Sequence, residues 1–187
     1  GVTNIRGSTF TLNSALGPNS ERGQGNGGAL SDTGGEQTTI SDSVISGNSA
    51  ANSGGGIYYQ PNAGGALMNV SNTTIANNVA NSNSDGVGSG GGVYITGVGV
   101  VTVTGSTISG NIATLGSPLP NSSGQGGGFY VEGALTLDNS TVSGNFAQSN
   151  YGGIVDTNPG GTADQVHISN STIVNNRAAG TCGGFGI

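Results

Sequence analysis

An eight-residue segment recurs six times along the chain, and this repetition constrains the fold more than any other feature. The copies begin at Ser8, Ser43, Thr73, Ser106, Ser140 and Ser171. The fourth copy reads Ser-Thr-Ile-Ser-Gly-Asn-Ile-Ala, and every copy has Asn at its sixth position and Ala at its eighth. The asparagines are Asn13, Asn48, Asn78, Asn111, Asn145 and Asn176. Their intervals of 30 to 35 residues are typical of a solenoid, a propeller or another repeat array.

A second landmark of each repeat is a pair of glycines followed by an apolar residue. The pairs are Gly27-Gly28, Gly55-Gly56, Gly91-Gly92, Gly127-Gly128, Gly152-Gly153 and Gly183-Gly184. Around each octet, apolar residues alternate with polar ones; Val101, Val103 and Ile108 alternate in this way around the fourth octet. This spacing favours extended chain with one buried face. The residue just before each octet is Gly, Asp or Asn, which tolerate a left-handed bend, and we assign Ser106 and Thr107 to the corner that follows.

These patterns predict an all-β fold: a parallel β-solenoid of about six rungs, where a rung is one turn of the solenoid, with three short strands per rung. We expect a single domain over residues 1–187, because the repeat runs through the whole chain. Equivalent residues of successive rungs should lie one above another in columns. The six octet asparagines should then form a buried ladder of amides with a structural role.

The repeat resembles a known family. The Gly-Gly-apolar segments and the S-T-I-S-G-N-x-A octets are similar to right-handed parallel β-helix repeats of the pectate-lyase-like superfamily. The rung pattern resembles more closely that of bacterial surface and polymorphic outer-membrane proteins. The resemblance covers essentially the whole chain and implies a single-stranded right-handed helix at the cell surface. It implies little about activity, because this solenoid carries lyases, hydrolases, adhesins and inert stalks.

The composition argues against several classes of partner. The chain has no Lys and only three Arg, so it lacks the basic surface that nucleic acids require. No apolar run approaches ~20 residues, so we expect no membrane insertion. The net charge of −6 arises from few charged groups, a surface common outside cells. The single cysteine, Cys182, can form neither an internal disulfide nor a zinc site.

The candidate acids do not form a recognisable catalytic pair. Glycoside hydrolysis normally requires two nearby carboxylates, and Glu132 and Asp138 fall on different predicted strands. The lone histidine, His167, has no nucleophile identifiable beside it. We therefore expect no catalytic residues and no cofactor. An alternative for a metal is Ca²⁺ at Asn81, Asn83 and Asp85, which match the first half of a calcium-binding loop without its final Glu.

Two features are candidates for binding. Counting from the Gly-Gly-apolar segments places Leu30, Tyr58, Tyr94 and Tyr130 at one outward position of consecutive rungs. The three tyrosines could contact a glycan or a partner, or support the sheet. Ice binding would need a flat, regular threonine array, and Thr102-x-Thr104 is the only such pair in the predicted outward registers, so the sequence argues against it. Asn121, in an Asn-x-Ser sequence, is a candidate glycosylation acceptor.

The two ends of the repeat suggest how the chain could assemble. The chain starts on a strand at Val2 to Arg6, without a preceding Gly-Gly strand, and stops on one at Phe185 to Ile187. The C-terminal Gly-Gly strand of one molecule, with Phe185 and Ile187, could supply the missing part of the first rung of the next, which begins with Val2 and Ile5, and such contacts would build a filament head to tail. The sequence thus favours a non-catalytic extracellular filament or cell-surface stalk or adhesin subunit. The alternative is a carbohydrate-binding or polysaccharide-degrading β-helix protein.

Overall fold

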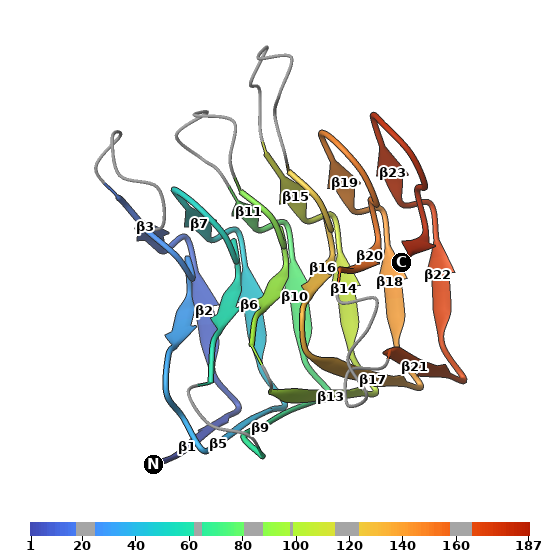
Figure 1. Cartoon of the computed structure of the whole chain (residues 1–187). Coiled ribbons are helices and arrows are strands. Elements are labelled where there is room, and N and C mark those ends of the chain that lie inside the picture. Colours follow the sequence, from blue (N-terminus) through green and yellow to red (C-terminus); the bar gives the residue numbers. More distant parts are fainter. Residues whose placement is uncertain (18–24, 62–64, 81–87, 98, 115–123, 158–165) are drawn as a thin grey trace.

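In a computed structural model, the chain forms a right-handed parallel β-solenoid, as the repeat predicted. The structure describes residues 1–17, 25–61, 65–80, 88–97, 99–114, 124–157 and 166–187, and within these ranges no residue is helical. Figure 1 shows the rungs following one another from the blue N-terminal rung to the red C-terminal rung. All strand pairs are parallel, and each strand pairs with its equivalents on the neighbouring rungs.

The strands form four sheets of six, here called sheets A to D. Sheet A contains β1 (Val2–Arg6), β5 (Gln37–Ser41), β9 (Leu67–Ser71), β13 (Val100–Thr104), β17 (Ala134–Asp138) and β21 (Val166–Ser169). Sheet B contains β2 (Thr9–Thr11), β6 (Val44–Ser46), β10 (Thr74–Ala76), β14 (Thr107–Ser109), β18 (Thr141–Ser143) and β22 (Thr172–Val174). Sheet C contains β3 (Ser14–Ala15), β7 (Ser49–Ala50), β11 (Val79–Ala80), β15 (Ile112–Ala113), β19 (Phe146–Ala147) and β23 (Arg177–Ala178). Sheet D contains β4 (Leu30–Asp32), β8 (Ile57–Tyr59), β12 (Val93–Ile95), β16 (Phe129–Val131), β20 (Ile154–Asp156) and β24 (Phe185–Gly186).

The prediction of three strands per rung was wrong, because each rung has four. The additional strand is the two-residue strand of sheet C, which follows the octet asparagine. Its second residue is always alanine, and Ala50, Ala80, Ala113 and Ala147 are fully buried. Two residues are too few to display the alternation by which a strand is recognised in a sequence. The short strand was therefore hidden inside the octet.

The bends that separate sheets A and B are the predicted left-handed residues. Gly7, Asp42, Asn72, Gly105, Asn139 and Asn170 have φ between 47° and 58°. The opening residue of each octet lies between the strands of sheets A and B. In the fourth octet this residue is Ser106, which is buried. Sequence reasoning placed Thr107 in the same corner, but Thr107 is the first residue of strand β14. Its side chain points away from the core, since the next residue, Ile108, is fully buried.

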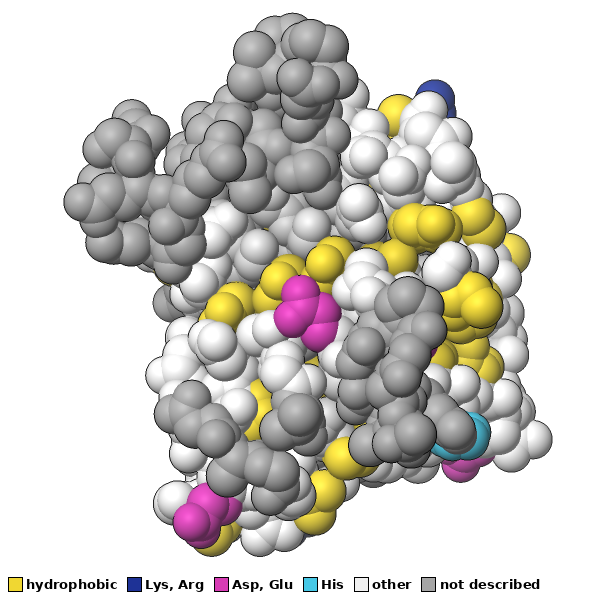
Figure 2. All heavy atoms as spheres, viewed as in Figure 1, with side chains coloured by type: hydrophobic (Ala, Val, Ile, Leu, Met, Phe, Trp, Pro, Cys, Tyr) yellow, Lys and Arg dark blue, Asp and Glu magenta, His cyan; other side chains and the backbone are white. Residues whose placement is uncertain are grey.

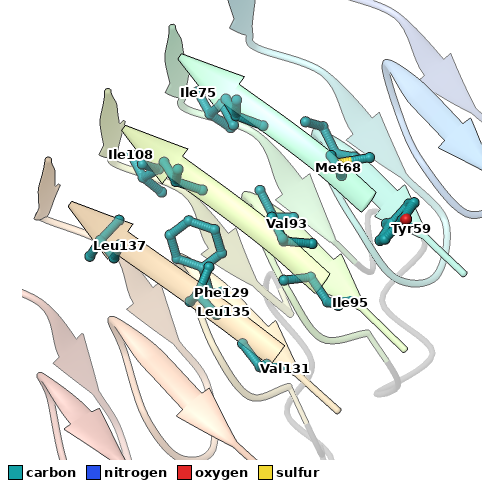
Figure 3. Close-up of a cluster of buried hydrophobic side chains, with 14 of the residues drawn as sticks. Tyr59, Met68, Ile75, Val93, Ile95, Ile108, Phe129, Val131, Leu135 and Leu137 are labelled. Carbon is teal, nitrogen blue, oxygen red and sulfur yellow. The ribbon is translucent and has the colours of Figure 1, made fainter. Parts of the chain in front are cut away.

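The core is a set of apolar columns running along the solenoid. Figure 3 shows Ile75 and Ile108 at equivalent positions on adjacent rungs, and Phe129 pointing into the same interior. Residues in these columns are mostly aliphatic, which suits close packing between identical neighbours. Tyr59 also lies in the core, and its hydroxyl is the one buried side-chain polar atom without a hydrogen-bond partner among the described residues.

The six octet asparagines form a continuous ladder. Asn111 is fully buried, and its Oδ1 accepts hydrogen bonds from the backbone N (3.0 Å) and Nδ2 (2.9 Å) of Asn78. The Nδ2 of Asn111 in turn donates to Asn145 Oδ1 (2.9 Å) and to the carbonyl of Ile75 (3.0 Å). The same pattern joins Asn13 to Asn48 and Asn145 to Asn176. Each amide thus satisfies backbone groups that a bend would otherwise leave buried and unpaired.

A second ladder, of hydroxyl groups, was not predicted. The backbone N of Ser106 donates to Ser140 Oγ at 3.1 Å, and Ser106 Oγ donates to the carbonyl of Thr104 at 2.9 Å. Ser106 Oγ itself accepts from the backbone N of Thr73 at 3.1 Å. The octet therefore begins with Ser or Thr because a hydroxyl can both donate to its own rung and accept from the previous one.

The glycine pairs exist because neighbouring rungs approach closely. A Cβ on Gly91 would lie 2.5 Å from the carbonyl oxygen of Gly127, and a Cβ on Gly92 would lie 2.7 Å from that of Gly128. These separations are below any normal contact distance. Even alanine at either position would therefore force the two rungs apart.

Replacing a central ladder residue should destabilise the protein strongly. The change Asn111→Ala removes the acceptor of both Asn78 donors and the Nδ2 donor of the Ile75 carbonyl, while Asn145 Oδ1 keeps only its bond from the backbone N of residue 111. We expect a loss of about 3 kcal/mol or more in the free energy of unfolding, measured by chemical denaturation. The control Asn13→Ala removes one side-chain bond at an exposed end and should cost about 1 kcal/mol. Equal losses for the two variants would contradict the ladder's role.

One residue of the first rung carries backbone strain. Leu12 has φ 56° and is 82% exposed, in a column where the other members are Gly or Asn. A left-handed conformation is unfavourable for Leu by about 1 kcal/mol. The change Leu12→Asn should therefore stabilise the protein by about that amount in the same denaturation experiment. Leu16→Asn is the matched control, because Leu16 is 83% exposed without a positive φ, and it should have little effect.

Candidate binding surfaces

Three tyrosines form a stacked row on the outer side of sheet D. The ring centroids of Tyr58 and Tyr94 are 5.3 Å apart with planes inclined by 8°. Those of Tyr94 and Tyr130 are 4.6 Å apart and inclined by 3°. Strands β8, β12 and β16 hold the rings in register, because each tyrosine is the central residue of its strand.

The column that contains the three tyrosines begins with Ser31, and not with Leu30 as predicted. Sequence counting placed Leu30 beside Tyr58, but strand β4 pairs Ser31 with Tyr58 and Leu30 with Ile57. Leu30 packs against the core instead. The predicted alignment was shifted by one residue because rungs two to four carry three consecutive glycines. Gly27 is equivalent to Gly54, the first glycine of such a triplet, and both have a positive φ. The next position in the column after Tyr130 is Val155.

The row is less exposed than the sequence suggested. Tyr58 is only 9% exposed, and Tyr94 and Tyr130 are partly buried. Tyr94 has a tyrosine ring against each face. A sugar ring binds an aromatic residue through the ring's face, so Tyr94 has no free face to offer. This geometry favours support of the sheet over stacking on a glycan.

Glu132, just after strand β16, is the acidic group associated with the row. Its Oε1 accepts a hydrogen bond from the Tyr94 hydroxyl at 3.4 Å, and its Oε2 accepts one from the hydroxyl of Thr96. Burial raises the pKa of Tyr94 above its ordinary range, and the Glu132 charge raises it further. Burial and then Glu132 also raise the pKa of Tyr58. The tyrosines therefore stay protonated at all physiological pH values.

Asp138 lies apart from Glu132, at the end of strand β17 in sheet A. It accepts hydrogen bonds from Ser169 Oγ (2.7 Å) and Asn170 Nδ2 (3.0 Å), and these bonds lower its pKa. Its neighbours in the same column are Thr104 and Ser169, so no carboxylate stands beside it on adjacent rungs. Both acids are held by polar side chains of a neighbouring rung, and no described contact joins them to each other.

The other predicted candidates give no assembled site. Asn121, Asn81, Asn83 and Asp85 lie outside the described residues. His167 is exposed on strand β21, and Cys182 is an exposed free thiol whose Sγ lies 3.0 Å from the carbonyl oxygen of Phe185. Within the described ranges no three His, Cys, Asp or Glu residues gather as a metal ion would require.

The two end faces expose apolar side chains of the first and last rungs. Val2 is 64% exposed on the first rung, whereas Ile5 is only partly exposed. Phe185 and Ile187 are 37% and 81% exposed on the last rung. All four sheets have six strands, so neither end rung lacks a strand that the other could supply. Counted from sheet A to sheet D, both end rungs are therefore complete, and the missing strand expected from the sequence does not exist.

The lateral surface carries few charges. Figure 2 shows acidic groups at separate points of this face, between bands of hydrophobic and neutral polar atoms. Among the described residues, the one side-chain ion pair is Arg6 with Asp42, whose Nε and Oδ2 are 3.2 Å apart at the surface. No part of the chain that the structure describes forms a helix with the length and hydrophobicity needed to span a membrane.

Fold and surfaces together define a single-stranded parallel β-solenoid repeat protein. Residues 42–60 match the Chlamydia polymorphic membrane protein repeat. This stretch runs from the bend at Asp42 through Asn48 and the three glycines to Tyr59 and Gln60, so it contains the landmarks of one rung. The match points to a cell-surface or outer-membrane type of β-solenoid. Comparison with curated proteins gives no significant match, and comparison with solved structures gives none either.

The tyrosine row should make the protein sensitive to alkali. Because the pKa values of Tyr58, Tyr94 and Tyr130 are raised above 10.0 in the folded state, unfolded chains lose these protons first. Their contribution to stability is thus complete below pH 10 and declines as pH rises beyond it. Titration by ultraviolet absorbance should show that the tyrosines of the row ionise at higher pH in the native protein than in denaturant.

The variant Glu132→Gln separates the two causes of this shift. It removes the negative charge beside Tyr94 but leaves the ring buried. The high-pH titration step should move down yet stay above its position in denaturant. No movement at all would show that Glu132 does not act on the row.

Proposed function

We propose that this chain is a non-catalytic extracellular β-solenoid that assembles head to tail, as the subunit of a filament or of a cell-surface stalk or adhesin. The observation that supports assembly is the complementarity of its two end faces in hydrogen bonding. The match to a membrane-protein repeat supports a location at the cell surface. The absence of contact between Glu132 and Asp138 supports a structural role over polysaccharide cleavage.

The asparagine ladder has a direction, which makes its two ends different. In every step the backbone N and Nδ2 of one asparagine donate to Oδ1 of the next. At the first rung no described donor reaches Asn13 Oδ1, and at the last rung the backbone N of Asn176 has no ladder acceptor. A second copy placed on the last rung would set its Asn13 Oδ1 against these donors and continue the ladder.

The hydroxyl ladder has the same polarity. The backbone N of Ser140 donates to Ser171 Oγ, and the next hydroxyl in sequence would be Ser8 of a second copy. Ser8 Oγ donates to the carbonyl of Arg6 and can still accept. Both ladders therefore present acceptors at the head and donors at the tail. Two heads or two tails would place like groups together, so only head-to-tail stacking satisfies them.

The apolar columns also continue across such a contact. The inward residues of the last rung include Ile168, Ile173 and Phe185, all partly exposed. In the repeat register they would lie against Ile5, Phe10 and Leu30 of a second copy, which belong to the same columns. Burial of these apolar edges would provide the driving force for association, and the ladders would provide its direction.

Assembly can be tested with a charge placed on the tail. The 187-residue chain should form rods that lengthen with concentration, seen by electron microscopy and by light scattering. Phe185→Asp puts a carboxylate against the apolar head of the next copy and should leave single short rods. Val44→Asp is a matched control on the side of the solenoid, because Val44 is 39% exposed and Phe185 is 37% exposed. This control should assemble like the parent chain. A parent chain that stays monomeric at high concentration would refute the proposal.

A further inference from the structure

The second residue of the octet forms a column of threonines on the outer face of sheet B. Its members, in rung order, are Thr9, Val44, Thr74, Thr107, Thr141 and Thr172. The column was missed from sequence because Thr107 was assigned to a corner. The structure places it on a strand, with its side chain directed to solvent.

The hydroxyl groups of this column are not used by the fold. No described hydrogen bond involves the side chain of Thr107 or Thr141, in contrast to the hydroxyl ladder beside them. The same holds for Thr9, Thr74 and Thr172. Every one of these threonines has solvent-exposed surface. Five hydroxyls therefore stand in one line, available for water or for a ligand.

This face carries no charge. Its second outward column, two residues further along each strand, consists of Thr11, Ser46, Ala76, Ser109, Ser143 and Val174. The outer face of sheet A differs, since it includes Arg6, Asp138 and His167. A charged ligand would thus find no partner on sheet B. Its surface of methyl and hydroxyl groups suits a neutral, ordered occupant.

The spacing of the column is fixed by the backbone. Neighbouring parallel strands lie about 4.7–4.9 Å apart, so successive threonines repeat at that distance. The asparagine and hydroxyl ladders run beside the sheet on every rung, and side-chain ladders of this kind keep stacked sheets flat. Threonine is also β-branched, so its hydroxyl has few positions to occupy. The strand pairing thus repeats the threonine position on five of the six rungs, with Val44 on the second.

The oxygen–oxygen spacing in tetrahedrally bonded water is close to the spacing of the threonines along the column. With an O–H···O distance of about 2.75 Å and tetrahedral angles, two water oxygens bonded to a common neighbour lie about 4.5 Å apart. In an ice lattice the perpendicular repeat is eight-thirds of the bond length, about 7.3 Å. The two outward columns of sheet B are two residues apart, about 6.6–6.8 Å. Both repeats of the protein surface are therefore within about a tenth of those of ice.

We propose that the outer face of sheet B is an ice-binding surface, on which the column from Thr9 to Thr172 holds a row of ordered waters that joins an ice crystal. The second column supplies further hydroxyls at Thr11, Ser46, Ser109 and Ser143. The inference is independent of head-to-tail assembly. Assembly would only lengthen the array, since Thr172 would be followed by Thr9 of the next copy.

The test is incorporation into growing ice. Ice grown slowly excludes ordinary solutes, so the parent chain should be enriched in the ice fraction over the remaining liquid. Thr107→Lys places a long charged side chain in the middle of the column and should abolish this enrichment. Thr141→Lys repeats the test one rung away, in case the first variant folds poorly. Circular dichroism would establish that each variant is folded.

The control variant is Thr102→Lys. Thr102 lies on the same rung as Thr107 but on the outer face of sheet A. It should leave the enrichment unchanged. Exclusion of the parent chain from ice would overturn the proposal, and so would an equal loss in Thr102→Lys, because the effect would then not belong to sheet B.

Discussion

The structure depends on satisfying buried backbone groups at the bend between sheets B and C. A chain that turns four times per rung cannot pair every amide with its own sheet, and an unpaired buried amide costs more than a typical hydrogen bond gains. Asn111 solves this problem for its rung by accepting two donors from the rung before and donating to a carbonyl of that rung and to the next asparagine. The same bonds recur in full at Asn48, Asn78 and Asn145 and in part at the two end asparagines, which explains why the octet recurs so closely while the segments between octets differ in length.

The ladder also explains which features a sequence can predict. The parallel solenoid, the left-handed bends and the inward columns all follow from residue types that recur with the repeat, such as Asn72 before its octet and Ile108 within one. The two-residue strands of sheet C could not be predicted, because Ile112–Ala113 is too short to show alternation. The hydroxyl ladder was hidden because a buried serine and a solvated serine look alike in a sequence, and only the bond from Thr73 to Ser106 distinguishes them.

The candidate surfaces were harder to predict than the fold, for two physical reasons. One is register: a run of three glycines leaves the alignment of Gly27-Gly28 undetermined by one residue, and a one-residue shift exchanges the inner and outer faces. Leu30 was therefore placed outside although it packs against the core. The other reason is that stacking is a relation between side chains. The sequence shows Tyr58, Tyr94 and Tyr130 at equivalent positions, but not that their rings lie face to face and cover one another.

A protein whose interior is fully used by such ladders can vary only at its outer faces and its two ends. The octet leaves few positions free, and the second one, Thr107 and its equivalents, is the outward position that the repeat keeps most uniform without using it for the fold. Buried uniformity is explained by packing, because Ile108 must fit Ile75. Exposed uniformity is less strictly required: β-branched threonine suits a strand, but replacing a solvated side chain usually changes stability little. The outer face of sheet B repeats regularly because the interior beneath it does. It is therefore the surface on which this solenoid can bind a periodic ligand such as an ice lattice.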